Sequence, residues 1–123
     1  MDSNCKITTE SLREARGRTL SLVADLDQDQ MMGPRLAIVN PLLWEIGHLA
    51  WFQEYWVLRH LLRRASILTN GDALYDSAKV AHETRWDLPL PSKSETLAYM
   101  QNVLDGVLSV TESGKDGNRK EDV

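Results

Sequence analysis

The fold is decided by one stretch of the chain, Asn40-Pro41-Leu42-Leu43-Trp44-Glu45-Ile46-Gly47-His48-Leu49-Ala50-Trp51-Phe52-Gln53-Glu54-Tyr55-Trp56. Asn40 is a suitable N-cap residue, Pro41 fits the first helical turn, and the carboxylate of Glu45 complements the positive end of a helix. Residues at steps of four and three then share one stripe of that helix: Trp44, His48, Trp51, Tyr55, Leu58 and Leu62. We therefore expect a long core helix that ends near Arg64.

His48 lies in the middle of this aromatic stripe. A buried imidazole must either be held in place by hydrogen bonds or serve as a ligand, because an unpaired polar group in a core is costly. Both interpretations stay open from the residues alone: a structural core histidine, or a metal ligand.

Two further amphipathic segments predict helices on either side of the central one. The first follows a cap at Thr8 or Thr9 and carries residues at heptad spacing: Leu12, Ala15, Thr19, Leu22 and Leu26. The second opens with the capping box Ser92-Lys93-Ser94-Glu95 and has a buried edge formed by Leu97, Met100, Leu104 and Val107. Period-two alternation never persists, so the fold class is all-α, an up-and-down helix bundle with three long helices.

The chain is long enough for one domain, which we place at residues 9–111, after an N-terminal tail of residues 1–8. Residues 112–123 carry no large apolar side chain except Val123, and we expect this tail to be disordered. The connection from Ile67 to Pro91 is irregular, with a short helix expected over residues 73–82. A second apolar ridge on the central helix has no partner in the sequence: Leu49, Phe52 and Trp56. The loop, a second copy of the chain, or a missing helix would have to cover it.

Composition excludes several functional classes. The net charge of −4 argues against non-specific nucleic-acid binding, which needs a surplus of cations on one face. Cys5 is the one cysteine, so the chain has no disulfide framework and no thiolate metal cluster. No apolar run approaches the roughly 18 residues that a membrane span needs, and the N-terminus lacks a signal-peptide core. We therefore expect a cytoplasmic protein without a membrane partner.

The central stretch resembles the first metal-ligand helix of the DinB-like domain in ergothioneine-type sulfoxide synthases. The likeness covers about residues 11–110 and is closest to the selenoneine synthase branch, through Asn40 to Glu45, Tyr55 to Arg59, Leu74-Tyr75-Asp76-Ser77 and His82-Glu83-Thr84-Arg85-Trp86. The resemblance implies a four-helix bundle fused to a C-terminal domain of the formylglycine-generating-enzyme type. Such enzymes use iron(II), held by three histidines, and O₂ to join sulfur or selenium to the imidazole ring of hercynine.

His48 matches the first iron ligand of that family. The other two ligands belong to a His-x-x-x-His-x-Glu motif on the fourth helix, which this sequence lacks, as it lacks the second domain. His82, with Glu45 or Glu54, would make only a speculative substitute. By resemblance, the loop residues His82, Arg85 and Trp86 are candidates for binding the thiol or selenol donor. Arg85 offers a fork of donors and Trp86 a flat apolar wall.

Three interpretations follow. The leading one is the N-terminal DinB-like part of a selenoneine or ergothioneine synthase-like enzyme, with one iron ligand, weak or no iron binding of its own, and no activity alone. The second is a helical interaction module that dimerises through its open apolar face, with His48 in a structural role. The third is a small metal protein that builds its site across a dimer from two copies of His48.

Overall fold

The computed structural model describes the backbone of residues 9–121 and the side chains of residues 9–111, and within these bounds it contains helices, turns and loops but no strand. The long helices are α2 (Thr9–Val23), α4 (Leu42–Gln53), which continues as the π-helix η1 (Glu54–Leu61), and α6 (Lys93–Glu121). The all-α helical bundle is therefore confirmed. No helix in the described part of the chain is both long and apolar enough to cross a bilayer.

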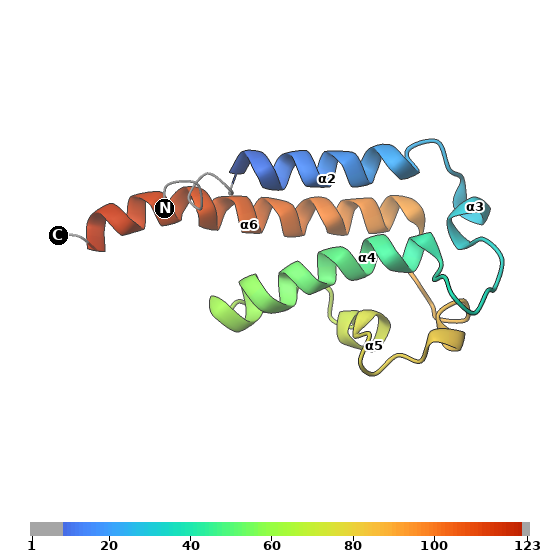
Figure 1. Cartoon of the computed structure of the whole chain (residues 1–123). Helices are drawn as coiled ribbons and strands as arrows, with labels where there is room; N and C mark the ends of the chain where they lie inside the picture. Colours follow the sequence, from blue (N-terminus) through green and yellow to red (C-terminus); the bar gives the residue numbers. More distant parts are fainter. Residues whose placement is uncertain (1–8, 122–123) are drawn as a thin grey trace.

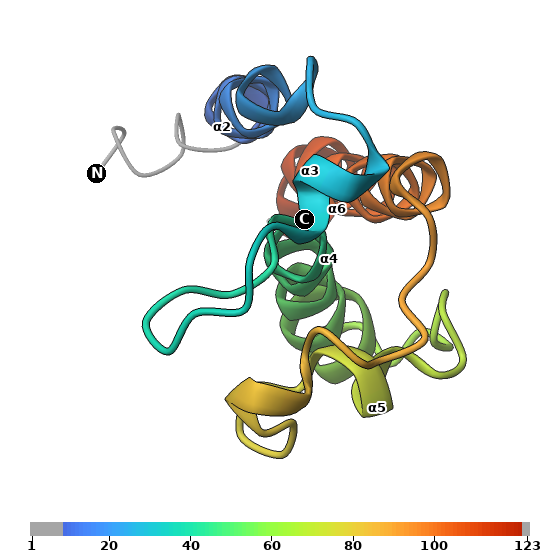
Figure 2. The same cartoon turned by 90° about the vertical axis from the view of Figure 1, so that its right-hand side faces the viewer.

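Helix α6 lies at the centre of the bundle, with α2 and α4 packed against it (Figure 1). Seen along the long helices, α2 and α4 flank α6 and leave one side of the bundle open between them (Figure 2). Helix α2 runs opposite to the other two, whereas α4 and α6 run in the same direction (Figure 1). The connection between η1 and α6 carries the chain back to the end where α4 began, so the expected up-and-down alternation holds only for the first pair.

The core comes from the predicted faces of α4 and α6 and from two short helices. Helix α3 (Gln28–Met32) starts at a capping box between Asp27 and Gln30, and its Met31 is fully buried. The short helix expected over residues 73–82 instead spans Gly71–Tyr75 as α5, and η2 (His82–Thr84) is a single 3-10 turn. The cluster at the centre contains Leu43, Trp44, Trp51, Leu58, Leu74, Tyr75, Tyr99, Met100, Val103 and Val107.

The start of α4 differs in detail from the sequence prediction. Pro41 is the N-cap residue, and Asn40 instead donates from Nδ2 to the carboxylate of Glu45 at 2.5 Å. Residues Glu54–Leu61 continue the helix with π-type winding, and the helix ends at Leu61 rather than near residue 64. At the other long helix, the predicted capping box between Ser92 and Glu95 is confirmed by its two reciprocal hydrogen bonds. The backbone of α6 remains helical to Glu121, past the predicted boundary at residue 111; the side chains there lie outside the described part.

The heptad stripe of α2 enters the core only in part, contrary to expectation: Leu12 and Leu26 are partly buried against the core, whereas Ala15 and Leu22 are exposed. Leu22 is 80% exposed, while Arg16 and Val23 are the buried residues of this helix. On α4 and η1 the predicted unpartnered ridge is indeed open: Leu49, Phe52 and Trp56 are 46%, 53% and 47% exposed. Both helices therefore present apolar side chains to the open side of the bundle.

Candidate functional site

His48 is held in a single orientation by the backbone of α5. Its Nδ1 lies 2.8 Å from the carbonyl oxygen of Tyr75, which can only accept, so Nδ1 carries the proton and donates it. The ring also stacks on Trp44, with centroids 4.7 Å apart and planes 9° apart. Nε2 makes no hydrogen bond to the described residues. A backbone acceptor on one ring nitrogen and a free lone pair on the other is the arrangement of metal-ligating histidines.

Tyr75 supplies that acceptor because its ring is locked under α4. The ring is fully buried and touches Gly47, where an added Cβ would lie within 3.0 Å of three atoms of the phenol. Its hydroxyl makes no hydrogen bond to the described residues, and burial raises the pKa of Tyr75 to about 12. Gly47 in α4 and Tyr75 at the end of α5 thus set the position of His48.

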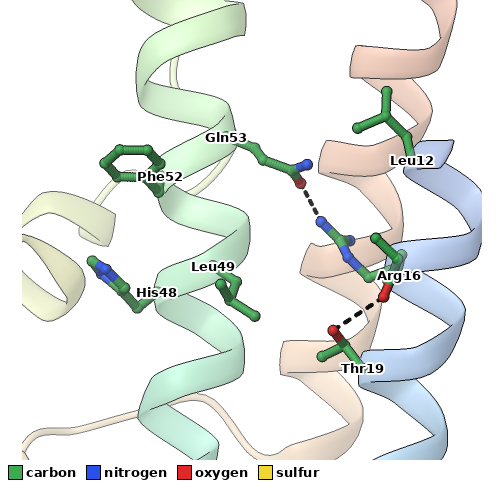
Figure 3. Close-up of a pocket in the computed structure, with 8 residues that line it drawn as sticks. Leu12, Arg16, Thr19, His48, Leu49, Phe52 and Gln53 are labelled. Atoms are coloured by element: carbon green, nitrogen blue, oxygen red, sulfur yellow. Dashed lines mark hydrogen bonds between the residues drawn. The ribbon is translucent and has the colours of Figure 1, made fainter. Parts of the chain in front are cut away.

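A hollow of about 360 Å³ opens between α2 and α4, on the side of the bundle that α6 does not cover. Its walls come from two successive turns of each helix: Leu12, Ala15, Arg16 and Thr19 on α2, and His48, Leu49, Phe52 and Gln53 on α4. In Figure 3, Leu49 and Gln53 point from α4 toward α2, and the side chain of Arg16 meets Gln53. The hollow is mostly apolar, with a few polar groups at fixed places.

Arg16 forms the polar floor of this hollow. It is 6% exposed, donates from Nη1 to the carbonyl oxygen of Met100 at 2.6 Å, and donates from Nη2 to the side-chain oxygen of Gln53. These bonds link α2 to both α6 and α4. Burial lowers the pKa of Arg16, and no described carboxylate pairs with the guanidinium to counter it. The site therefore contains a buried cation whose partners among the described residues are all neutral.

Glu54 is unsuited to join His48 in a metal site. It is fully buried and accepts a hydrogen bond from the Tyr99 hydroxyl at 2.6 Å and one from the backbone N–H of Ile67 at 2.5 Å. Burial and the hydrogen bond to Glu54 raise the pKa of Tyr99 well above its ordinary value, so the phenol stays a donor. Glu45 is bonded to Asn40. Among the described residues, no three histidine, cysteine or acidic side chains are grouped closely enough to hold a metal ion.

Four rings form a row along the open face of α4 and η1. Centroids are separated by 6.2 Å from His48 to Phe52, 6.3 Å from Phe52 to Trp56, and 5.2 Å from Trp56 to His60. The row continues the apolar surface beyond the hollow, so His48 stands at one end of an exposed aromatic strip rather than in a closed pocket.

Comparison with known proteins identifies the family to which this helical domain belongs. The family model for the DinB superfamily matches residues 11–121. The chain belongs to the DinB superfamily. It is also similar to proteins named hercynine oxygenase from Mycolicibacterium smegmatis (31% identical over 96 residues), Mycobacterium tuberculosis (31% over 114) and Mycolicibacterium thermoresistibile (32% over 99). These matches cover 76%, 84% and 79% of this chain but only 22%, 25% and 22% of those relatives.

The DinB helices and the resemblance to ergothioneine-related enzymes are thus confirmed at the level of the family. The matched region contains the helix with His48 and the loop with His82, Arg85 and Trp86. Because the chain spans about a quarter of the length of these relatives, their activity bears on it only as a proposal.

Among the described residues, no hydrogen bond or ring contact joins His82, Arg85 or Trp86 directly to His48, although Arg85 and His48 both lie against the ring of Trp44. His82 donates from Nε2 to the carbonyl oxygen of Val39 at 2.6 Å and meets Trp86 edge-on, with centroids 5.0 Å apart. Trp86 is half-buried, lies under the guanidinium of Arg35 at 5.3 Å, and has an indole N–H without a partner among the described residues. His82 and Trp86 thus form one cluster, bonded to the segment before α4.

Arg85 is buried, and its contacts join the loop before α6 to the start of α4. Its guanidinium lies 4.0 Å above the ring of Trp44 and donates to the carbonyl oxygens of Val80 and Ser77 and to the side-chain oxygen of Asn40. Each of its three nitrogens has a partner in the protein. Binding of the thiol or selenol substrate by His82, Arg85 and Trp86 stays a prediction. Arg85 could contribute to it only through N–H groups that these hydrogen bonds do not use.

Sequence reasoning does not single out Arg16, which lines the hollow, or Asp72, which accepts a hydrogen bond from Trp51 of the aromatic stripe. Arg16 could be found from its spacing, since it shares one face of α2 with Leu20 and Val23, at steps of four and three. Asp72 has no such signal: it follows the Asn70-Gly71 turn, yet its carboxylate accepts from the indole of Trp51 at 2.7 Å and pairs with Arg59. The hydrogen bonds from Arg59 lower the pKa of Asp72 to about 2.

Proposed function

We propose that this chain forms the DinB part of an O₂-dependent non-haem iron enzyme that joins sulfur or selenium to the imidazole of hercynine, with His48 as one iron ligand. The observation that carries the proposal is the hydrogen bond from Nδ1 of His48 to Tyr75, which leaves Nε2 free for a metal. The similarity to hercynine oxygenases points to the same chemistry. The selenium branch rests on the sequence resemblance in the loops around Tyr75 and Arg85.

Iron would need more ligands than the described residues provide. His48 fits the role of one ligand, but no group of three candidate ligands exists among them. In this proposal the remaining ligands come from elsewhere, and His82, Arg85 and Trp86 bind the thiol or selenol donor. The chain by itself should therefore hold iron(II) weakly and should not couple hercynine to a donor.

The decisive experiment compares two histidines on the same helix. Iron(II) is added anaerobically to the wild type, to His48→Ala and to His60→Ala, and the imidazole signals are followed by NMR. We expect paramagnetic broadening that begins at His48 and disappears in His48→Ala, while His60→Ala behaves as the wild type. Equal broadening at both histidines, or loss only in His60→Ala, would remove the basis for the iron proposal.

An activity assay tests the second half of the proposal. Hercynine, O₂, iron(II) and a thiol or selenol donor are incubated with the chain, and the product is measured by mass spectrometry. We expect no product above the protein-free control. Product formation would show that the chain completes the iron site by itself, for example across a dimer.

A second candidate function is a helical interaction module, favoured by the exposure of Leu49, Phe52 and Trp56. Burying a large apolar side chain stabilises a protein by roughly 1.5–3 kcal/mol, so a partner that covers all three would gain a substantial free energy. If that partner is a second copy, sedimentation over a concentration series will show a dimer that Phe52→Glu dissociates. Iron-dependent broadening at His48 would favour the first candidate.

A further inference from the structure

The continuous helix formed by α4 and η1 ends in a stretch that is rich in cations. Arg59, His60, Arg63 and Arg64 lie close together in the sequence, and residues 55–71 contain no aspartate or glutamate. This excess of positive charge contrasts with the net charge of −4 of the whole chain. Some cations are expected at the C-terminal end of a helix, where the macrodipole is equivalent to roughly half a negative charge. Three arginines are more than that charge requires.

The basic side chains surround a hollow at the end of η1. This hollow has a volume of about 390 Å³ and is lined by Tyr55, Arg59, His60, Arg63 and Arg64. In a π-helix, which is bonded i→i+5, the residues four and five positions after Tyr55 lie on either side of it one turn later, and these are Arg59 and His60. The winding of η1 thus brings both basic side chains to the same side as the tyrosine ring.

A left-handed turn brings the last two arginines to this hollow. Arg63 has a φ of 60° and is the one non-glycine residue with a positive φ in the described part of the chain. Two backbone hydrogen bonds close the turn, from Leu62 to the carbonyl oxygen of Val57 at 3.1 Å and from Arg64 to that of Leu58 at 2.8 Å. Glycine is the usual residue at such a position, because a side chain makes left-handed backbone unfavourable. Arg63 is exposed, so packing does not explain why an arginine stands there.

The three arginines differ in what they already bind. Arg59 donates two hydrogen bonds to the carboxylate of Asp72, at 2.6 Å and 3.0 Å, and its guanidinium lies over the ring of Tyr55 at 5.1 Å from the centroid. Two of its five N–H groups are used in this way, and the others remain available. Arg63 and Arg64 have no carboxylate partner among the described residues. The hollow therefore combines one guanidinium held in place with two that are unpaired.

A phosphate group matches this set of donors. Guanidinium groups bind phosphate oxygens through paired hydrogen bonds, and a doubly charged phosphate would balance the charges of Arg63 and Arg64. The volume of about 390 Å³ lies within the range of small-molecule sites, roughly 300–1,000 Å³, and the ring of Tyr55 supplies one flat wall. Nucleic acid would need cations spread along an extended face, whereas these are gathered at one end of one helix.

We propose that the hollow at the end of η1 binds a phosphate group carried by a small soluble molecule. Arg59 is the fixed donor, held by Asp72, while Arg63 and Arg64 close on the anion from the turn that follows the helix. The left-handed backbone of Arg63 sets the direction of both. This binding site goes beyond the iron chemistry proposed above, and it holds whether or not His48 binds a metal.

The test is calorimetric titration of the metal-free chain with inorganic pyrophosphate, and with citrate as a carboxylate of similar charge. The variants are Arg63→Gly and Arg64→Gln. The matched control is Arg18→Gln, which removes an equal charge from an exposed position of α2. Urea unfolding is measured for every variant.

We expect pyrophosphate to bind equally to the wild type and to Arg18→Gln, and more tightly than citrate does. Arg63→Gly and Arg64→Gln should each bind it about tenfold more weakly, a ratio expected for the loss of one charge-assisted hydrogen bond. Arg63→Gly should at the same time resist urea better than the wild type, because glycine adopts a positive φ without strain. Weaker binding by a more stable protein excludes misfolding as its cause.

Several outcomes would overturn the proposal. Absence of pyrophosphate binding, or an equal loss in Arg18→Gln, would show that the hollow is not a phosphate site. Equal affinity for citrate would show that it attracts anions through charge alone. Binding to phosphatidylserine vesicles that pyrophosphate does not displace would assign the arginines to a membrane surface. None of these measurements uses iron, so their failure is distinct from a failure of the iron proposal.

Discussion

Replacing Gly47 by alanine tests the contact that positions His48. The new Cβ would lie within 3.0 Å of Cζ, Cε1 and the hydroxyl oxygen of Tyr75, and this ring is fully buried. Overpacking a core costs about 1–3 kcal/mol, and three clashes with one aromatic ring place this case at the upper end. Alanine would recover about 1 kcal/mol of helix propensity, which leaves a net loss of about 2 kcal/mol.

The measurement is urea unfolding followed by circular dichroism, with Gly17→Ala as the matched control. Gly17 also lies within a helix, but a Cβ there would meet no atom within 4 Å. We expect Gly17→Ala to raise the free energy of unfolding by about 0.5–1 kcal/mol, while Gly47→Ala lowers it. In Gly47→Ala the carbonyl of Tyr75 should also move, and NMR should show both imidazole tautomers at His48. If Gly47→Ala gains stability as the control does, the ring of Tyr75 does not lock this helix.

Three other expectations concern different parts of the molecule. Tyr99→Phe should destabilise the fold by about 1–3 kcal/mol in urea unfolding, because the buried carboxylate of Glu54 loses a donor; an unchanged midpoint would show that the bond is not needed. The pKa of Asp72 is lowered from 3.8 to about 2, so its contribution to stability is present above pH 3.8 and is lost as the pH falls toward 2. Between pH 3.8 and about 2, the melting temperature should fall less steeply with pH in Arg59→Met than in the wild type. If the two plots of melting temperature against pH are parallel, the ion pair does not contribute to stability. Hydrogen exchange should be fast over residues 112–121, because this stretch has no large apolar residue to hold it against the bundle; slow exchange there would contradict the expected disorder.

The long helices and their buried faces could be predicted because local signals and packing agree. The capping box at Ser92 and the apolar edge of the last helix lie where the sequence places them. On α2 the heptad stripe and the buried face differ, because the helix packs on α6 through Arg16 and Val23 while Leu22 remains outside. Periodicity identifies an apolar face but cannot say which element covers it.

The details of the site depend on contacts between distant residues, and these leave weak traces in the sequence. His48 could be singled out from its place in an aromatic stripe, but its acceptor is a backbone carbonyl of Tyr75, which any residue type would provide. Arg85 has the form of a ligand-binding arginine, yet its guanidinium fastens the loop to the start of α4. Only the folded arrangement distinguishes a donor that is free from one that is already used.

The π-helical segment has a consequence for the row of rings on the open face. In an α-helix, a step of four residues overshoots a full turn by about 40°, so side chains at such steps drift around the axis. The i→i+5 hydrogen bonds of Glu54–Leu61 close a wider turn, so a step of four residues there covers less than a full turn. Side chains at such steps therefore rotate around the helix axis in one direction before Glu54 and in the opposite direction after it. Because each residue of this segment turns the chain by less than the value of about 100° in an α-helix, loss of one residue and rewinding as an α-helix would nearly cancel for the chain beyond Leu61. The wide turn thus takes up one residue without rotating the chain that follows, and it changes the direction of only those side chains that lie within it, such as Trp56 and His60.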